Sequence, residues 1–275
     1  MRPEGAIPVA IGLGCAAVAL AGKVQAHVVR RIRKDGGQVQ TSEWRMPDAL
    51  VALVLAAALV TICGAAILHR GAGSEAVKIE QVLPGSLFFP VLAAGVAAFL
   101  SYRGLQLVPA FGLARLGPGQ VIGWSLGLVI IAFVFVGVTN AATLRAMQGK
   151  AEQQPLVNLF RDVAQRGDTA AMAKIFFAGV ILAPVAEEFI FRGFFYAVGK
   201  RYLGPLASGF VTALLFAAIH LSLTAVAGLF VLAVCLTLAY ERTGSLLVPI
   251  GMHALFNFTS LAVVYCLARG WLSAP

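Results

Sequence analysis

Two adjacent glutamates lie inside a stretch of sequence that is otherwise apolar. Residues 183–195 read APVAEEFIFRGFF, so Glu187, Glu188 and Arg192 sit in the middle of a hydrophobic run. Each ionisable group inside a membrane costs at least about 2.5 to 3.5 kcal/mol on insertion scales, and such groups usually face the protein interior and carry a function. Glu188 and Arg192, four residues apart, can form an ion pair on one helix face, but that pair leaves Glu187 unexplained.

Two histidines and an amide are the other polar candidates inside apolar runs. His220 ends the stretch FAAIH, and His253 and Asn257 begin and end the stretch HALFN. His253 and Asn257 are one helical turn apart and therefore share a helix face. A carboxylate and two imidazoles in a partly dry cavity are suited to hydrolysis.

Two hydrolytic mechanisms are compatible with these side chains. In the first, Glu187, His220 and His253 hold a divalent metal such as zinc, which lowers the pKa of its bound water toward about 7. In the second, which we favour, no cofactor is required, because Glu187 itself takes the proton from a water held against His220.

The remaining polar groups have supporting tasks in the second mechanism. Arg192 keeps the carboxyl group of Glu188 ionised. His253 and Asn257, stacked on one helix face, are donors aimed at the oxyanion that develops during acyl hydrolysis. All of these groups then belong to one interior site.

The composition shows which elements must position this site. Of the 275 residues, 60% are hydrophobic and 12% are charged, and the mean hydropathy is +0.88. A soluble domain has about 45–50% apolar and about 25% charged residues, and about 20 apolar residues cross the hydrocarbon core of a bilayer. The chain has eight candidate runs, at 6–22, 48–68, 84–101, 120–141, 174–199, 204–223, 225–240 and 245–267. We therefore predict an all-α polytopic membrane protein with about eight transmembrane helices and a polar intramembrane cavity.

Helical geometry allows the polar candidates to meet inside such a bundle. At a rise of about 1.5 Å per residue, the four catalytic candidates fall within about 12 Å of one another in depth. Pro184 removes a backbone hydrogen bond to Val180 and should kink its helix near the glutamates. Pro249 and Gly251 loosen the last run in the same way. Irregular backbone of this kind is expected around a polar cavity that is shielded from lipid.

The three motifs together resemble a known family. EExxxR occurs as EEFIFR at 187–192, FxxxH as FAAIH at 216–220 and HxxxN as HALFN at 253–257, in that order and each in a separate apolar run. The sequence resembles the CAAX prenyl protease and bacteriocin-processing family of intramembrane endopeptidases, which includes the Ras-converting enzyme and the bacterial Abi proteins. The resemblance covers about residues 174–267, and no motif position departs from the pattern.

This resemblance implies an eight-helix membrane protease. In it, the match to Glu187 activates water together with the match to His220, and the matches to His253 and Asn257 hold the oxyanion. The substrate is then a peptide or protein cut near its C-terminus or in a membrane-proximal part, prenylated for eukaryotic members and mostly unknown for bacterial ones. The family is often called metal-dependent, which keeps the metal set as an alternative.

The motifs also divide the chain into three expected parts. Residues 1–173 form an N-terminal four-helix membrane region with a polar connector, 174–267 form the catalytic helices, and 268–275 form a short C-terminal tail. Within the connector, apolar residues of 156–163 recur at helical spacing, which is typical of a helix in the headgroup plane. That pattern fits a surface connector and a substrate gate equally well.

The net charge of +9 points to the membrane surface. Lys and Arg residues sit in short loops between apolar runs, so we expect anionic lipid headgroups as partners and no nucleic acid. The densest cluster, RRIRK at 30–34, follows the first run and predicts a cytoplasmic loop and a retained anchor instead of a cleaved signal peptide. We therefore expect a multi-pass integral membrane protein, located in the plasma membrane if the source is prokaryotic.

Two other patterns have simple structural explanations. The cysteines Cys15, Cys63, Cys235 and Cys266 fall inside predicted runs without CxxC spacing, which is typical of buried small apolar residues and not of disulfides. The stretch GWSLG at 123–127 matches GxSxG but lies in an apolar helix, where small residues let helices approach closely.

Two further functions are compatible with the polar candidates. A proton- or ion-coupled transporter would use Glu187, Glu188 and the histidines as a relay. A non-proteolytic family member would bind and regulate a membrane partner without cutting it.

Overall fold

The computed structural model describes residues 3–69, 79–148 and 155–272, and the described residues form helices joined by short connections, without a β-strand. In chain order the helical segments are α1 (Pro3–Asp35), α2 (Met46–His69), α3 (Ile79–Ser86), α4 (Phe88–Tyr102), α5 (Leu107–Ala110), α6 (Pro118–Ala146), α7 (Pro155–Arg166), α8 (Thr169–Phe176), η2 (Phe177–Leu182), α9 (Ala183–Glu188), η3 (Phe189–Tyr196), α10 (Ala197–Leu203), α11 (Pro205–Ile219), α12 (Val226–Thr243) and α13 (Leu247–Ala268). The segments η2 and η3 are π-helical.

Six stretches of the described chain are helical, long enough and apolar enough to cross a membrane. They are Met46–Leu68, Ile79–Tyr102, Pro118–Ala146, Thr169–Leu203, Val226–Thr243 and Leu247–Ala268. The predicted all-α, multi-pass membrane class is therefore confirmed. The predicted count of eight is not, since the run at 204–223 becomes the 15-residue helix α11 and most side chains of the run at 6–22 lie outside the described residues.

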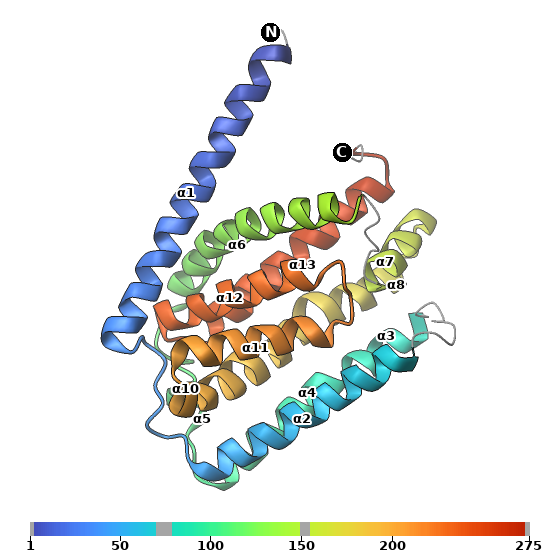
Figure 1. Ribbon diagram of the computed structural model, residues 1–275. Coiled ribbons are helices and arrows are strands. Elements are labelled where there is room, and N and C mark those ends of the chain that lie inside the picture. Colours follow the sequence, from blue (N-terminus) through green and yellow to red (C-terminus); the bar gives the residue numbers. More distant parts are fainter. Residues whose placement is uncertain (1–2, 70–78, 149–154, 273–275) are drawn as a thin grey trace.

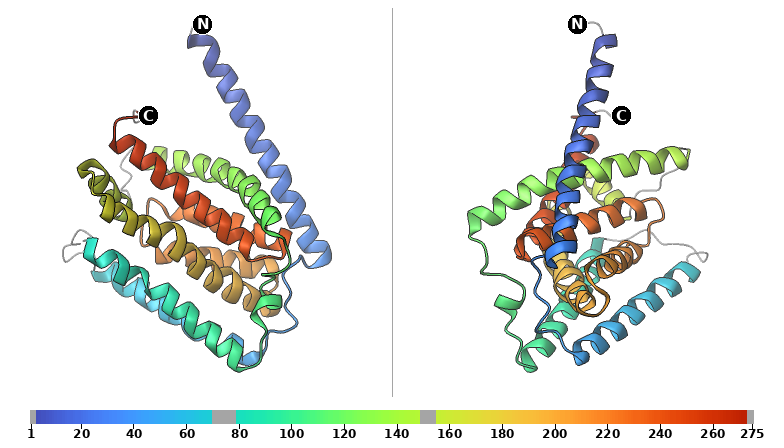
Figure 2. Two further views of the ribbon diagram at one scale, coloured as in Figure 1. Left: turned by 180° about the vertical axis from the view of Figure 1, so that it is seen from behind. Right: turned by 60° about the vertical axis from the view of Figure 1, so that its left-hand side comes forward.

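Most helices lie side by side in one bundle, and α1 projects away from it (Figure 1). Both views of Figure 2 show the N-terminal end of α1 far from the other helices. The C-terminal part of α1, where Val28 and Ile32 are buried, packs against α12 and α6.

The span Thr169–Leu203 runs through the centre of the bundle. Its middle is buried all round, because all residues of η3 after Phe189 are inaccessible to solvent or nearly so. Aromatic side chains from elsewhere in the chain pack against η3: Trp44 and Phe111 from connections between helices, and Phe216 from α11. A segment that is apolar on every side fits this central position.

The effect of Pro184 differs from the sequence-based prediction. The backbone N–H of Ala183 donates to the carbonyl of Ala178, five residues back, so the helix is already in the π register here. The bond that the proline removes in this register is the one to Gly179, and not the one to Val180. Single π-helical turns of this kind occur frequently at functional sites.

The predicted amphipathic helix in the connector is present as α7. Its apolar residues Phe160, Val163 and Ala164 are buried, and α7 packs against α8 and α13. The apolar face of α7 therefore contacts protein, in one cluster with Ile175 and Leu261.

The stretch GWSLG marks a close contact between two helices, as predicted. Ser125 of α6 is buried and donates to the carbonyl of Val248 in α13 at 3.1 Å. A Cβ atom on Gly251 would lie 2.6 Å from the Ser125 hydroxyl, so a larger residue there would force the Ser125 side chain to move. The serine therefore packs two helices together.

The cysteine prediction is correct for two of the four residues. Cys63 and Cys235 are buried, whereas Cys266 is half-buried and Cys15 is exposed on the projecting helix α1. All four are free thiols. A thiol behaves as a small apolar group, so an outward-facing position on a membrane helix does not require burial.

Candidate active site

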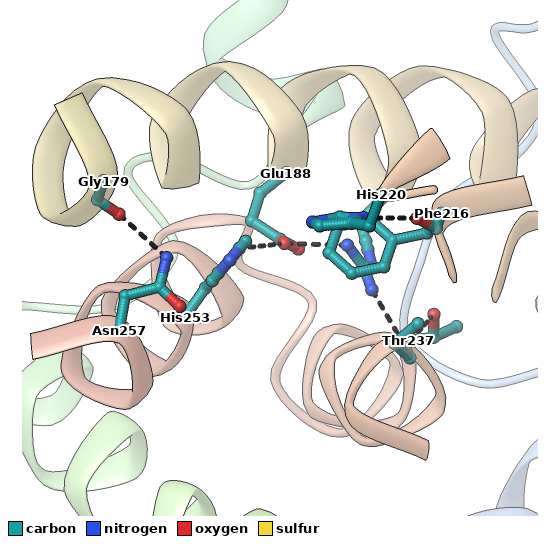
Figure 3. A network of polar contacts seen from close by, with 9 residues as sticks. Gly179, Glu188, Phe216, His220, Thr237, His253 and Asn257 are labelled. Carbon is teal, nitrogen blue, oxygen red and sulfur yellow. Dashed lines mark hydrogen bonds and ion pairs between the residues drawn. The ribbon is translucent and has the colours of Figure 1, made fainter. Parts of the chain in front are cut away.

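Four segments of the bundle bring the predicted site residues together. Glu187 and Glu188 end α9, Arg192 lies in η3, His220 follows directly on α11, and His253 and Asn257 lie in α13. Figure 3 shows Glu188, Phe216, His220, His253 and Asn257 in one interior region.

Glu188 is at the centre of the polar network. Its Oε1 atom accepts a hydrogen bond from Arg192 Nη1 at 2.7 Å and from His253 Nδ1 at 2.8 Å. The Glu188 side chain is 0% exposed, and Arg192 and His253 are 2% and 3% exposed. The residue expected to have a supporting task therefore fixes the orientation of His253.

Arg192 is held by two further contacts. Its Nη2 donates to the carbonyl of Ala233 in α12 at 3.1 Å, and Thr237 Oγ1 donates to the same carbonyl at 3.0 Å. The guanidinium carbon lies 4.5 Å from the centre of the Phe216 ring. Arg192 is therefore fixed by a carboxylate, a backbone carbonyl and an aromatic face, which makes it a rigid counter-charge.

Phe216, the first residue of FxxxH, contacts both histidines. Its ring centroid lies 4.8 Å from that of His220 and 5.8 Å from that of His253. Phe216 is 0% exposed and also packs edge-on against Phe191. The two imidazoles thus share one aromatic neighbour, which sequence spacing alone did not reveal.

His220 lies where α11 ends. Its Nδ1 is 2.7 Å from the carbonyl oxygen of Phe216, and because a carbonyl only accepts, Nδ1 carries the proton in this contact. The Nε2 atom is therefore the nitrogen that can receive a hydrogen bond. The next residue, Leu221, has a left-handed backbone with φ +51°, which turns the chain sharply after the histidine.

Glu187 faces the protein interior, as predicted, and is 8% exposed. Its Oε2 atom has no hydrogen-bond partner among the described residues. Both Glu187 and Glu188 interact electrostatically with Arg192. A buried carboxylate with a free acceptor atom next to a cation is suited to proton transfer.

Asn257 contacts the backbone of the central span. Its Nδ2 donates to the carbonyl of Gly179 in η2 at 2.8 Å, and the side chain is half-buried (Figure 3). An amide nitrogen carries two hydrogens, so one N–H is held by Gly179 and the other stays available.

The alternative metal set does not fit this geometry. Within the described ranges, no three His, Cys, Asp or Glu side chains form a group that could hold a metal ion. The carboxylate that contacts His253 is Glu188, whereas the predicted set was Glu187, His220 and His253. A zinc site needs its ligand atoms to converge at about 2.0–2.2 Å from one point.

A further buried carboxylate, with its own set of partners, was missed by the sequence analysis. Glu241 of α12 is 2% exposed, and its Oε1 accepts hydrogen bonds from Tyr196 Oη at 2.6 Å and Lys200 Nζ at 2.5 Å. Its Oε2 accepts from the backbone N–H groups of Gln38 and Val39 at 2.8 and 3.3 Å. The signal was the spacing, because positions 188, 192, 196 and 200 form one polar stripe at intervals of four residues.

Comparison with known proteins agrees with this arrangement. The profile of the family described as "Type II CAAX prenyl endopeptidase Rce1-like" matches residues 169–259, which include all three motifs. A protein of Escherichia coli named "Uncharacterized 24.3 kDa protein" is 33% identical over 192 residues, which cover 65% of this chain and 80% of the relative. No solved structure matches. The chain therefore belongs to the CAAX prenyl protease and bacteriocin-processing family of intramembrane proteases.

Proposed function

We propose that the chain is an intramembrane endopeptidase that hydrolyses a peptide bond near the C-terminus or in a membrane-proximal part of a peptide or protein substrate. The observation that carries this proposal is the buried cluster of Glu188, Arg192 and His253, joined at 2.7 and 2.8 Å, with the Glu187 carboxylate buried beside it. We place the catalytic helices in residues 174–267.

Glu187 is the general base of the proposed reaction. Its Oε2 atom is an acceptor without a partner among the described residues, so it can take a proton from water. His220 uses Nδ1 on the Phe216 carbonyl, and its Nε2 can therefore accept a hydrogen bond from the same water. These two groups orient and activate the nucleophile.

His253 and Asn257 stabilise the oxyanion in this mechanism. Asn257 offers the N–H that is not bonded to Gly179. His253 is oriented through Nδ1 by the Glu188 carboxylate at 2.8 Å, and its Nε2 would donate to the oxyanion when both ring nitrogens carry a proton. Arg192 in turn holds Glu188 in place.

The proposed hydrolysis consumes one water molecule and requires no cofactor. The water oxygen bonds to the substrate carbonyl carbon, and Glu187 receives the proton. The carbon–nitrogen bond then breaks, and the proton passes from Glu187 to the leaving amine. The substrate is a peptide or protein held at the lipid bilayer.

Cleavage by the purified protein tests the proposal. Prenylated and unprenylated peptides with free C-termini are incubated with the wild type and with Glu187→Gln, and metal content is measured on the same samples. We expect the variant to remain folded and to lose turnover by about 10²- to 10⁴-fold, which is the usual contribution of a general base. The matched control is Glu80→Gln, because Glu80 is exposed at the start of α3. Full turnover by Glu187→Gln would overturn the mechanism.

A second variant separates the protease from the transporter. A proton- or ion-coupled relay needs Glu187 but not an oxyanion donor, so transport should survive Asn257→Ala. A protease should lose turnover with either substitution. Proton uptake by vesicles containing each variant, measured beside peptide cleavage, gives opposite patterns for the two functions.

A further inference from the structure

The proline before the two glutamates leaves one backbone carbonyl without its usual partner. In η2 the N–H of Ala183 donates to Ala178, five residues back. The next donor in this register is residue 184, and its acceptor is the carbonyl of Gly179. Residue 184 is proline, which has no N–H to donate.

The free carbonyl is used by the active site. Gly179 accepts a hydrogen bond from Asn257 Nδ2 at 2.8 Å, so the contact joins the central span to α13 (Figure 3). Fixing one N–H of the amide on Gly179 also fixes the direction of the second N–H, because both lie in the plane of the amide group. The orientation of Asn257 therefore depends on a carbonyl that the backbone does not claim.

The residue before Pro184 has a backbone conformation that is unfavourable in front of a proline. Ala183 is in the right-handed helical region, with φ −62° and ψ −51°. A following proline disfavours this region for the residue before it, since the proline ring clashes with the preceding backbone. An alanine at 184 would suit the local helix better, so a local stability argument does not account for the proline.

We propose that Pro184 is a positioning residue. By withholding an N–H from the carbonyl of Gly179, it keeps that carbonyl available to hold the Asn257 side chain in the orientation that oxyanion binding requires. The expected effect on turnover rests on the proposed function, whereas the structural link between Pro184 and Asn257 does not.

The first experiment introduces the missing donor. In Pro184→Ala a backbone N–H can bond to the carbonyl of Gly179 and compete with Asn257 Nδ2 for it, which weakens the hold on the Asn257 side chain. We expect kcat to fall by about 10- to 100-fold, less than the about 10²- to 10³-fold typical of removing an oxyanion donor outright. KM should stay unchanged, because the oxyanion exists only in the transition state. The midpoint of thermal unfolding in detergent should stay the same or rise.

A matched control replaces a proline elsewhere. Pro84 also lies inside a membrane helix, within α3, which contributes none of the site residues. Pro84→Ala should leave kcat within about twofold, because Pro84 is exposed and no carbonyl of α3 holds a site residue. An equal loss of kcat in both variants would contradict a specific role for Pro184.

A double-mutant cycle asks whether Pro184 acts through Asn257. Asn257→Ala should lower the unfolding midpoint in the wild-type background, because it removes the hydrogen bond to Gly179. In the Pro184→Ala background the same substitution should lower the midpoint by less, since competition with the backbone N–H has already weakened that bond. The two losses of kcat should also fail to multiply. Independent effects in both measurements would overturn the proposal.

The same measurements distinguish a failure of the proposed protease function from a failure of the proposed role of Pro184. If the wild type cuts no peptide, or if Glu187→Gln cuts as fast as the wild type, the proposed function fails while the unfolding midpoints still test the link between Pro184 and Asn257. If cleavage depends on Glu187 but the midpoints are additive, the protease stands and the role of Pro184 fails.

Discussion

Glu188 and Glu241 are both buried carboxylates paired with a basic residue, yet their surroundings differ. Both oxygens of Glu241 are used, by Tyr196 and Lys200 on one side and by two backbone N–H groups on the other. Glu188 uses Oε1 twice, and its Oε2 has no partner among the described residues. The same is true of Oε2 in the adjacent Glu187.

This difference distinguishes a carboxylate that only holds helices together from one that has an acceptor atom left for a reaction. A fully bonded buried carboxylate has no acceptor capacity left for a reaction, and it joins elements together. Glu241 and Lys200 do this by joining α12 and α10 to the connection after α1, since Lys200 also donates to the carbonyl of Val39 at 2.8 Å. A buried carboxylate with a free acceptor is expected at a functional site.

The largest effect is expected from Glu188→Ala. The substitution leaves Arg192 buried without its counter-charge, and breaking a buried pair in this way costs about 3–5 kcal/mol. It also releases His253, so turnover should fall by at least about 10²-fold, as for a lost oxyanion donor. Thermal unfolding in detergent and peptide cleavage check both expectations. Normal turnover by the folded variant would show that Glu188 is only structural.

Glu241→Ala should lower the free energy of unfolding without lowering turnover. Lys200 becomes the unpaired buried charge, so unfolding should again become easier by about 3–5 kcal/mol. Turnover per folded molecule, measured at low temperature after removal of aggregates, should stay within about twofold because none of the hydrogen-bond partners of Glu241 is a proposed site residue. A catalytic loss without a stability loss would reverse the comparison between the two carboxylates.

Tyr196→Phe should destabilise the hydrogen-bonded cluster around Glu241 by a smaller amount. It removes only the hydroxyl that donates to Glu241 at 2.6 Å. A hydrogen bond to a charged group contributes about 1.5–3 kcal/mol, so the unfolding midpoint should fall less than in Glu241→Ala. If the midpoint does not change, the hydroxyl contributes nothing to the stability of the cluster.

The smallest effect is expected from Ser125→Ala. The loss of its hydrogen bond to the Val248 carbonyl should cost about 1 kcal/mol of stability. Cleavage should be unchanged, because Ser125 packs α6 against α13 and lies in neither carboxylate cluster. Loss of cleavage in a folded Ser125→Ala protein would instead favour a serine nucleophile.

The sequence predicted the membrane class and the burial of the glutamates and Arg192, because both depend on local properties. Runs of apolar residues require helices in lipid, where the backbone must satisfy its own hydrogen bonds. Charged groups such as Glu188 and Arg192 are too costly inside such runs to point outward. Their convergence on the interior therefore followed from energetics, whereas the catalytic role of Glu187 is still a prediction.

The contacts between helices could not be predicted in the same way. Whether Glu187 or Glu188 meets His253 depends on the rotation of α9, which the π-helical segments on either side change relative to a regular α-helix. Glu241 was missed because its partners are distant in the sequence: Tyr196 and Lys200 are 45 and 41 positions away, and Gln38 and Val39 more than 200. The shared neighbour Phe216 likewise becomes visible only when α11 and α13 are packed.

The early end of α11 has a consequence for the lipid around the protein. A helix of 15 residues rises about 22 Å, which is less than the about 30 Å of a typical hydrocarbon core. Such hydrophobic mismatch is relieved when the adjoining leaflet thins, at a cost of a fraction of a kcal/mol per Å. Thinning of the leaflet beside His220 would bring the site residues closer to water.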